Sequence, residues 1–350
     1  MSLKKKLIFI TVFLIACICI YIAGDFLVEF LEATNQPLIE IYHSPTKFSR
    51  RHGHFTANIC GSISKQAKEV KYQLNGGDWI EVRNQSPRVP PPLFTIEMTS
   101  DELKNGPNTV MIEANSIFGK KKSIRLDFHY DSSPIQLPVK VEWIDTNLDV
   151  QDGYWETFCS DSGWRVRPKP GFEGYDRILA VTGSFPVGRR VKTDLVLRYK
   201  IGEPDWDYGF GILPMWGGRP DTKDYSPRRG WNFSIAWWFA RFKALGMEFS
   251  YKFGDSPAQW VGTYRKFIPQ YNTRYFLICE SWSVKDDDGK HLYYRQRMKW
   301  WTEGNPEPEE WMELKDIEGA PLPPGEYAVA LIAYHCQVDY GPVIIEPLDR

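Results

Sequence analysis

The sequence predicts an all-β protein, and three observations support this fold class. The 350 residues include 14 Trp, 18 Tyr and 20 Phe with 25 Pro and 27 Gly, a composition typical of short strands and frequent turns. Several segments alternate apolar and polar residues with a period of two, as strands with one buried face do. The one long apolar run lies near the N-terminus and precedes all of these segments.

Net charge excludes one large class of partner. The chain carries 43 basic and 44 acidic side chains, so no excess of positive charge is available to bind a nucleic-acid backbone. We therefore expect no nucleic-acid partner.

The N-terminal segment predicts a membrane anchor. Lys4 to Lys6 precede an uncharged run from Leu7 to Gly24, which ends at Asp25. At about 1.5 Å per residue, a helix of this length nearly crosses a hydrocarbon core of roughly 30 Å. The positive-inside rule keeps the lysines cytoplasmic, so everything after about residue 25 is expected on the extracytoplasmic side. Residues 1–38 are accordingly interpreted as a transmembrane helix followed by a short stalk.

Two other interpretations of this segment stay open. A cleaved signal peptide has a shorter apolar stretch and a small-residue cleavage site, and Tyr21 to Ala23 fits such a site poorly. Leu14 to Cys17 resembles a bacterial lipobox with Cys17 as the lipidated residue, but Ile18 to Ala23 stays apolar where a mature lipoprotein turns polar. The length of the run favours an uncleaved signal anchor, and all three interpretations export the rest of the chain.

Residues 39–131 are expected to form a small sandwich. The pair Asn75-Gly76 between two alternating runs is a strong hairpin signal. The strands expected are 55–63, 69–74, 79–82, 93–98, 108–115 and 122–130.

Two stretches of this region, VKYQLNGGDWIEV and LKNGPNTVMIEANSIFGKKKSIRLDFHY, resemble bacterial immunoglobulin-like or fibronectin-like modules. The resemblance implies an immunoglobulin-like spacer domain. The Cys, Trp, Cys arrangement of antibody domains is absent, because Cys60 is the only cysteine of the region.

A linker, residues 132–138, leads to a larger domain over residues 139–350. Period-two alternation in residues 194–201, 231–239 and 291–301 predicts strands that have one face in a core and one facing solvent or a ligand. A double-sheet sandwich follows.

This domain resembles the concanavalin A-like lectin/glucanase superfamily in its laminin-G-like branch. The segments that carry the resemblance include YDRILAVTGSFPVGRRVKTDLVLRY, DYGFGILPMWGG, RRGWNFSIAWWF, YYRQRMKWWTEGNPEPEEWMEL and LIAYHCQVDYGPVIIEPL. The resemblance implies a jelly-roll fold. It leaves the activity open, since the superfamily holds lectins, carbohydrate-binding modules, glycosidases, lyases and adhesion domains.

The motif evidence favours binding over catalysis. Retaining glucanases of this fold place carboxylates about 5 to 5.5 Å apart in a Glu-x-Asp-x-x-Glu pattern. The nearest match, Glu203 to Asp207, lacks the last Glu and contains Pro204, so we interpret it as a loop. A glycoside hydrolase or lyase on the same fold is one alternative, and a structural or assembly protein of the cell surface is another.

No cofactor is expected, and calcium is the one metal ion that a segment of the sequence could bind. Asp286-Asp287-Asp288-Gly289 could offer oxygens to calcium, but the EF-hand spacing is missing, and a hairpin turn is favoured. Cys279 and Cys336 both fall in expected strands, where either a disulfide or two separate buried thiols is open.

Flat aromatic rings and planar hydrogen-bonding groups are the side chains that recognise carbohydrate. If three of the expected strands share one sheet, their polar faces combine both kinds of group, and arginine forks match the carboxylate or sulfate of an acidic glycan. An ordinary solvated face is the alternative interpretation, and a cell-surface protein is the alternative partner. Trp231 and Trp237 are assigned to the core. The candidate ligand-binding residues are Arg198, Asn232, Trp238, Tyr293, Arg295 and Arg297, with Trp216 in an adjoining loop.

Overall fold

The computed structural model describes Tyr21 and residues 37–52, 54–64, 66–82, 93–144, 147–185, 188–202, 207–219, 230–241, 244–252, 259–260, 268–317 and 326–348. Within these ranges no helix is both long enough and apolar enough to span a membrane. Apart from Tyr21, the predicted anchor lies outside them, as do Glu203 to Trp206 of the predicted loop.

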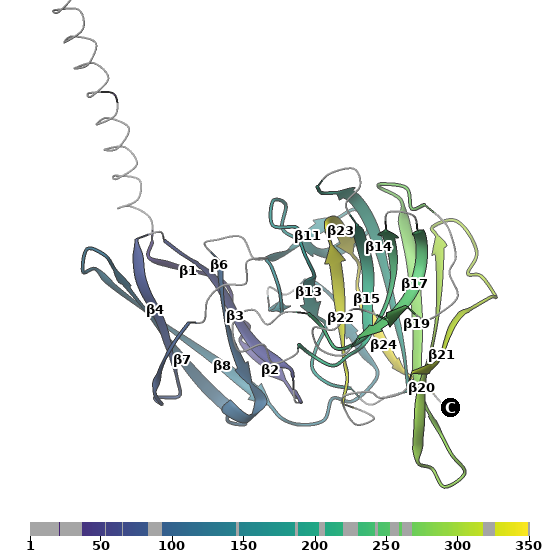
Figure 1. The fold of residues 1–350 in the computed structure, drawn as a ribbon, viewed down its shortest axis with the longest axis horizontal. Coiled ribbons are helices and arrows are strands. Elements are labelled where there is room, and N and C mark those ends of the chain that lie inside the picture. The colour runs from purple at the N-terminus through teal and green to yellow at the C-terminus, as the bar shows by residue number, and fades with distance from the viewer. Residues whose placement is uncertain are drawn as a thin grey trace, which may run out of the picture.

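The described part of the chain is built almost wholly from strands, in two groups of sheets (Figure 1). The first group contains strands between residues 39 and 131, and a short 3-10 helix, η1 (Ser100–Glu102), precedes β7. Its three-stranded sheet has the order β1 (Ile39–His43), β3 (Thr56–Ile63), β6 (Leu93–Thr99). Its five-stranded sheet has the order β2 (Lys47–Ser49), β8 (Lys121–Asp131), β7 (Gly106–Ser116), β4 (Ala67–Leu74), β5 (Trp79–Glu81).

The second group forms the C-terminal sandwich, which is antiparallel throughout the described pairs. The seven-stranded sheet has the order β10 (Asp149–Val150), β13 (Arg177–Ala180), β22 (Ala328–Tyr334), β15 (Tyr208–Trp216), β16 (Phe233–Arg241), β17 (Ala244–Lys252), β18 (Gln259–Trp260). The nine-stranded sheet runs β11 (Trp155–Ser160), β12 (Gly163–Pro168), β23 (Cys336–Tyr340), β14 (Arg189–Lys200), β19 (Arg274–Lys285), β20 (His291–Thr302), β21 (Met312–Ile317), with β24 (Val343–Pro347) on β14 and β9 (Val139–Val141) on β24.

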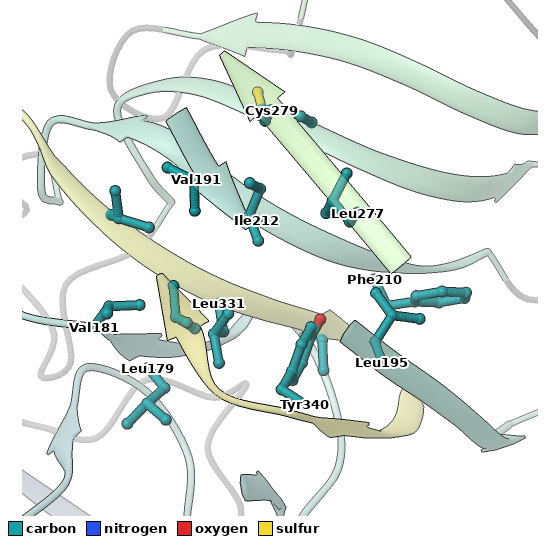
Figure 2. Packing of buried hydrophobic residues seen from close by; sticks show 14 of the residues in the cluster. Leu179, Val181, Val191, Leu195, Phe210, Ile212, Leu277, Cys279, Leu331 and Tyr340 are labelled. Carbon is teal, nitrogen blue, oxygen red and sulfur yellow. The ribbon is translucent and has the colours of Figure 1, made fainter. Parts of the chain in front are cut away.

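The two large sheets enclose the main core. Leu195 and Leu277 of the nine-stranded sheet face Phe210, Ile212 and Leu331 of the seven-stranded sheet, and all five are fully buried (Figure 2). Burial of this apolar surface between two layers is what stabilises a sandwich. The predicted all-β fold and its double-sheet sandwich are confirmed.

The hairpin signals of the sequence correspond to turns in the structure. Asn75 and Gly76 adopt positive φ, 52° and 73°, between β4 and β5. Between β19 and β20, the carboxylate of Asp286 accepts hydrogen bonds from the backbone N–H groups of Asp288 and Lys290. This Asp-rich segment is therefore a turn, as favoured.

The four described cysteines, Cys60, Cys159, Cys279 and Cys336, are free thiols, so the disulfide alternative for Cys279 and Cys336 is not realised. Burial raises the pKa of both thiols well above the ordinary value, which keeps them protonated and unreactive.

One strand differs from its predicted orientation. Trp238 was assigned to the solvent or ligand face, yet it is fully buried in the core between the two sheets. Trp237 and Phe239 occupy the opposite face of β16, where they stack on each other with ring centroids 4.3 Å apart. That face is buried as well, and Gly209 of β15 leaves the space for it, because a Cβ there would lie 2.5 Å from the Phe239 ring.

The N-terminal sandwich packs directly on the C-terminal one. Phe55 meets Trp216 edge to face, with ring centroids 5.2 Å apart. Gly218 has φ of 77°, and a Cβ there would lie 2.4 Å from the backbone oxygen of His54, so the two backbones touch where only glycine fits. The buried Arg51 forms an ion pair with the partly buried Asp149 across the same contact. Trp216, predicted in a loop beside a cleft, is instead the buried last residue of β15 at this contact.

Candidate functional site: the outer face of β19 and β20

The strongest candidate site lies on the side of the nine-stranded sheet that faces away from the core. Along β20, Tyr294, Gln296, Met298 and Trp300 are buried, so the residues between them point outward by the two-residue period of a strand. These outward residues, Tyr293, Arg295, Arg297, Lys299 and Trp301, are all partly exposed.

Strand register places further groups beside them. In the β19–β20 pair, Glu280 lies opposite Arg297 and Trp282 lies opposite Arg295. On the other side of β19, Glu280 lies opposite Arg190 of β14. We use the term outer β19–β20 face for Arg190, Phe276, Glu280, Trp282, Tyr293, Arg295, Arg297, Lys299, Trp301 and the adjoining Trp311.

Glu280 is the electrostatic centre of this face. Its carboxylate is fully buried and accepts hydrogen bonds from Nε of Arg190 at 2.7 Å and Nε of Arg297 at 2.6 Å. Burial acts to raise the pKa of Glu280, but the hydrogen bonds and positive charges of Arg297 and Arg190 outweigh it, so the pKa lies below the ordinary value. Glu280 is thus a fixed anion that orients two guanidinium groups.

Arg297 also contacts two indole rings. Its guanidinium carbon lies 4.1 Å from the ring centroid of Trp311 and 5.8 Å from that of Trp282. Lys299 lies over the same Trp311 ring at 4.4 Å and pairs with Glu307 at 2.9 Å. These cation–π contacts place both indole rings next to the cations of the face.

Arg295 differs from its neighbours in its partners. Its Nη2 donates to the hydroxyl of Tyr293 at 3.1 Å, and its guanidinium lies 5.6 Å from that ring. Among the described side chains no carboxylate pairs with it, and its buried Nε has no hydrogen-bond acceptor. A partly exposed guanidinium with unused donors is suited to bind an anionic group.

A second aromatic surface lies further along the same strands. Phe276 and Trp301 face each other across β19 and β20 and stack with centroids 5.3 Å apart and an interplanar angle of 25°. The guanidinium of Arg274 lies 5.1 Å from the Phe276 ring. Both rings are partly exposed, so this end of the face also offers a flat apolar surface.

The structure brings four of the seven predicted site residues to one sheet face. Tyr293, Arg295 and Arg297 are neighbours on β20, and Arg198 lies on β14 of the same sheet. Arg198 lies toward the other end of β14 from Arg190, where its guanidinium pairs with Asp339 at 2.5 Å and donates to Asn272 at 2.9 Å.

The other three predicted residues lie elsewhere. Trp216 and Trp238 belong to the seven-stranded sheet, Asn232 directly precedes its strand β16, and all three are buried. The expectation that strands 194–201, 231–239 and 291–301 share one sheet is therefore wrong for the second of them. The alternation of residues tells which side chains share a face of one strand, but it does not determine which strands lie next to each other.

Sequence reasoning missed the contribution of β19. Phe276, Glu280 and Trp282 alternate with the buried Tyr275, Leu277 and Cys279, so a period-two signal was present in the sequence. The partial exposure of Phe276 and Trp282, and the burial of Glu280 between two arginines, became evident only when β19 was found between β14 and β20.

Metal binding finds no support elsewhere. In the part of the chain that the structure describes, no group of three or more His, Cys, Asp or Glu side chains could hold a metal ion.

His335, which adopts positive φ of 50°, has its Nδ1 3.1 Å from the backbone oxygen of Asp207. Burial lowers its pKa, which favours the neutral ring.

Comparisons with known proteins give likenesses in architecture. No protein-family model and no curated protein matches the chain. Among solved structures, the exoplasmic/lumenal domain of VIP36 in its Ca2+/mannose-bound form is 13% identical with a TM-score of 0.39, over 57% of this chain and 83% of that one. The carbohydrate recognition domain of Emp47p is 8% identical with a TM-score of 0.32, over 59% of this chain and 94% of that one.

A carbohydrate-binding module of the β-sandwich superfamily is 11% identical with a TM-score of 0.20, over 90% of this chain and 98% of that one. At these identities and TM-scores the likeness concerns the β-sandwich alone.

Proposed function

We propose that this protein is anchored in a membrane by residues 7–24 and binds an acidic glycan, outside the cytoplasm, on the outer β19–β20 face. The observation that carries the proposal is the arrangement around Arg295, a guanidinium with no carboxylate partner among the described side chains, which contacts Tyr293 and lies opposite Trp282 in the strand register. The anchor and the extracytoplasmic location rest on the lysines and the apolar run of the N-terminal sequence.

The chemistry of this face suits a charged sugar. Flat rings pack against the apolar faces of pyranose rings, and an arginine fork matches the two oxygens of a carboxylate or sulfate. Arg297 and Arg190 add positive charge nearby, but both are already committed to Glu280. Arg295 is therefore the residue we assign to the acidic group.

The same geometry argues against a glycosidase at this face. A general acid for glycoside cleavage needs a carboxyl group with a raised pKa. Glu280 has a lowered pKa and two arginine partners. Binding without catalysis is the function that this arrangement supports best.

The test is a glycan array probed with the full chain in lipid nanodiscs. We expect binding to uronate-containing or sulfated glycans and none to neutral ones, with affinity falling as salt rises. Arg295→Ala should weaken binding about tenfold or more, as expected when a hydrogen-bonded charged partner is lost. Arg295→Lys should restore part of the affinity, because it keeps the charge without the fork. Trp282→Ala should weaken binding to the same glycans.

Arg125→Ala is the matched control, since Arg125 is an exposed arginine of the N-terminal sandwich that pairs with Asp127. Its affinity should equal that of the parent protein. A folded chain that binds no glycan would refute the proposal, and binding that survives both Arg295→Ala and Trp282→Ala would move the site to another face.

A further inference from the structure

The turn between β7 and β8 exposes two large apolar side chains next to each other. Ile117 is 60% exposed and Phe118 is 54% exposed. Hydrogen bonds close the turn, because the hydroxyl of Ser116 accepts from the backbone N–H groups of Phe118 at 3.2 Å and Lys120 at 2.9 Å. Large apolar side chains are normally buried on folding. Two adjacent exposed ones therefore suggest a surface that contacts something outside the chain.

Three consecutive lysines follow these apolar residues after Gly119. Lys121 pairs with Glu113 at 2.7 Å. Lys120 and Lys122 are exposed, and no ion pair is recorded for either among the described side chains. The turn thus places two exposed apolar side chains next to exposed, positively charged lysines.

Backbone hydrogen bonds place this turn at the end of the sandwich where the chain enters it. The N–H of Ile117 donates to the oxygen of Gln66 at 2.9 Å, and the N–H of Ser64 in the same β3–β4 connection donates to the oxygen of Leu38 at 3.1 Å. Leu38 directly precedes β1. Figure 1 shows the β7–β8 turn at the same end of the N-terminal sandwich as the starts of β1 and β4.

We propose that the β7–β8 turn inserts Ile117 and Phe118 into the headgroup layer of the membrane that holds residues 7–24, with Lys120 and Lys122 against anionic lipid headgroups. The inference rests on the anchoring part of the proposed function. Apolar and aromatic side chains beside lysines are the combination that interfacial membrane contacts use.

The tether makes this contact feasible. Thirteen residues lie between Gly24 and Leu38, a separation of about 20 Å if helical and about 50 Å if extended. Over such distances the anchor holds the turn at a high effective concentration near the bilayer, so a weak interaction suffices. Two exposed side chains form too small a patch for a stable protein interface, which favours lipid over a protein partner.

The experiment uses the full chain in nanodiscs of phosphatidylcholine and phosphatidylglycerol. An environment-sensitive nitrobenzoxadiazole dye is attached at Phe118→Cys, in a background where Cys17, Cys19 and the exposed Cys159 are replaced by serine. Leu292→Cys is the matched control, because Leu292 is 50% exposed on β20 of the other sandwich. Spin-labelled lipid and aqueous iodide serve as the two quenchers.

We expect the dye at position 118 to be quenched by spin-labelled lipid and protected from iodide, and the dye at 292 to show the reverse. Adding Lys120→Gln and Lys122→Gln should reduce the protection at 118. A chain that stays in the nanodiscs while position 118 behaves like position 292 would overturn the turn contact alone.

A dye at 118 shielded from both quenchers would indicate a protein contact and also overturn it. Failure of the chain to stay with the nanodiscs would overturn the anchor together with the turn contact. The quenching experiment contains no glycan. A failure of the proposed glycan binding would therefore appear only in the array experiment and would leave this result unchanged.

Discussion

At the scale of single residues, Asp152 joins two buried arginines of the C-terminal sandwich. Its buried carboxylate pairs with Arg177 at 2.7 Å and with Arg219 at 2.8 Å, and both guanidinium groups are buried as well. We expect Asp152→Ala to lower the free energy of unfolding by about 3 to 5 kcal/mol, because it leaves two buried cations without their anion. Urea denaturation of the full chain in detergent measures this.

Asp127→Ala is the control for that substitution. Asp127 pairs with Arg125 at 3.0 Å, but both side chains are exposed. Solvent screens such a pair, so its loss should lower the free energy of unfolding far less than the loss of Asp152 does. Equal losses for the two variants would show that burial of the Asp152 cluster contributes nothing.

A second residue-scale prediction concerns pH. His43 is buried, and its Nε2 accepts a hydrogen bond from the backbone N–H of Trp155 at 3.2 Å. Burial, with a smaller contribution from the charge of Lys169, lowers the pKa of His43 from 6.5 to about 4. Between these values the unfolded chain binds the proton and the folded chain does not, so stability is complete above the unfolded pKa and is lost as the pH falls toward the folded one.

The linkage relation gives a loss of about 2 kcal/mol in the free energy of unfolding at about pH 5 relative to neutral pH. His43→Gln removes the titrating group, so this variant should lose less stability than the parent protein between neutral pH and about pH 5, and the difference should equal this amount. Urea midpoints of both proteins at the two pH values supply the comparison. If the two proteins show the same pH dependence, His43 does not control acid stability.

At the scale of elements, the sequence predicted β20 well and β16 poorly, for a physical reason. One side of β20 meets the core and the other meets solvent, so polar and apolar residues alternate and the outward set could be named in advance. Both faces of β16 are buried, so Trp237 and Trp238 are both in apolar surroundings. Alternation then carries no information about which ring faces the core.

Strand neighbourhood was the other element-scale property that the sequence did not predict. Arg198 and Arg295 belong to one sheet because β19 pairs with both β14 and β20, and these pairings join residues up to 92 positions apart, as Arg189 and Ser281 are. Local patterns specify the period and the face of a strand but not its partner. The aromatic residues of β19 therefore entered the candidate site only with the fold.

At the scale of the whole molecule, the contact between the two sandwiches suggests that they unfold together. Phe55, Arg51 and Gly218 all contribute buried contacts to it. Thr56 adds a further buried contact, because its backbone oxygen accepts a hydrogen bond from the side-chain amide of Gln151 at 3.0 Å. A contact of this kind between buried groups is unlike a flexible junction between independent domains.

Tryptophan fluorescence can test this coupling, because every tryptophan except Trp79 lies in residues 139–350 and reports on the C-terminal part of the chain. Phe94 is buried in the core of the N-terminal sandwich, so Phe94→Ala should destabilise that sandwich by about 3 to 5 kcal/mol. In a coupled molecule the urea midpoint of the tryptophan signal must then fall. In a Phe55→Ala background, which removes the ring against Trp216, the same substitution should shift that signal less. Phe118→Ala, at an exposed site, should leave it unchanged, and a tryptophan midpoint insensitive to Phe94→Ala would establish that the two sandwiches unfold independently.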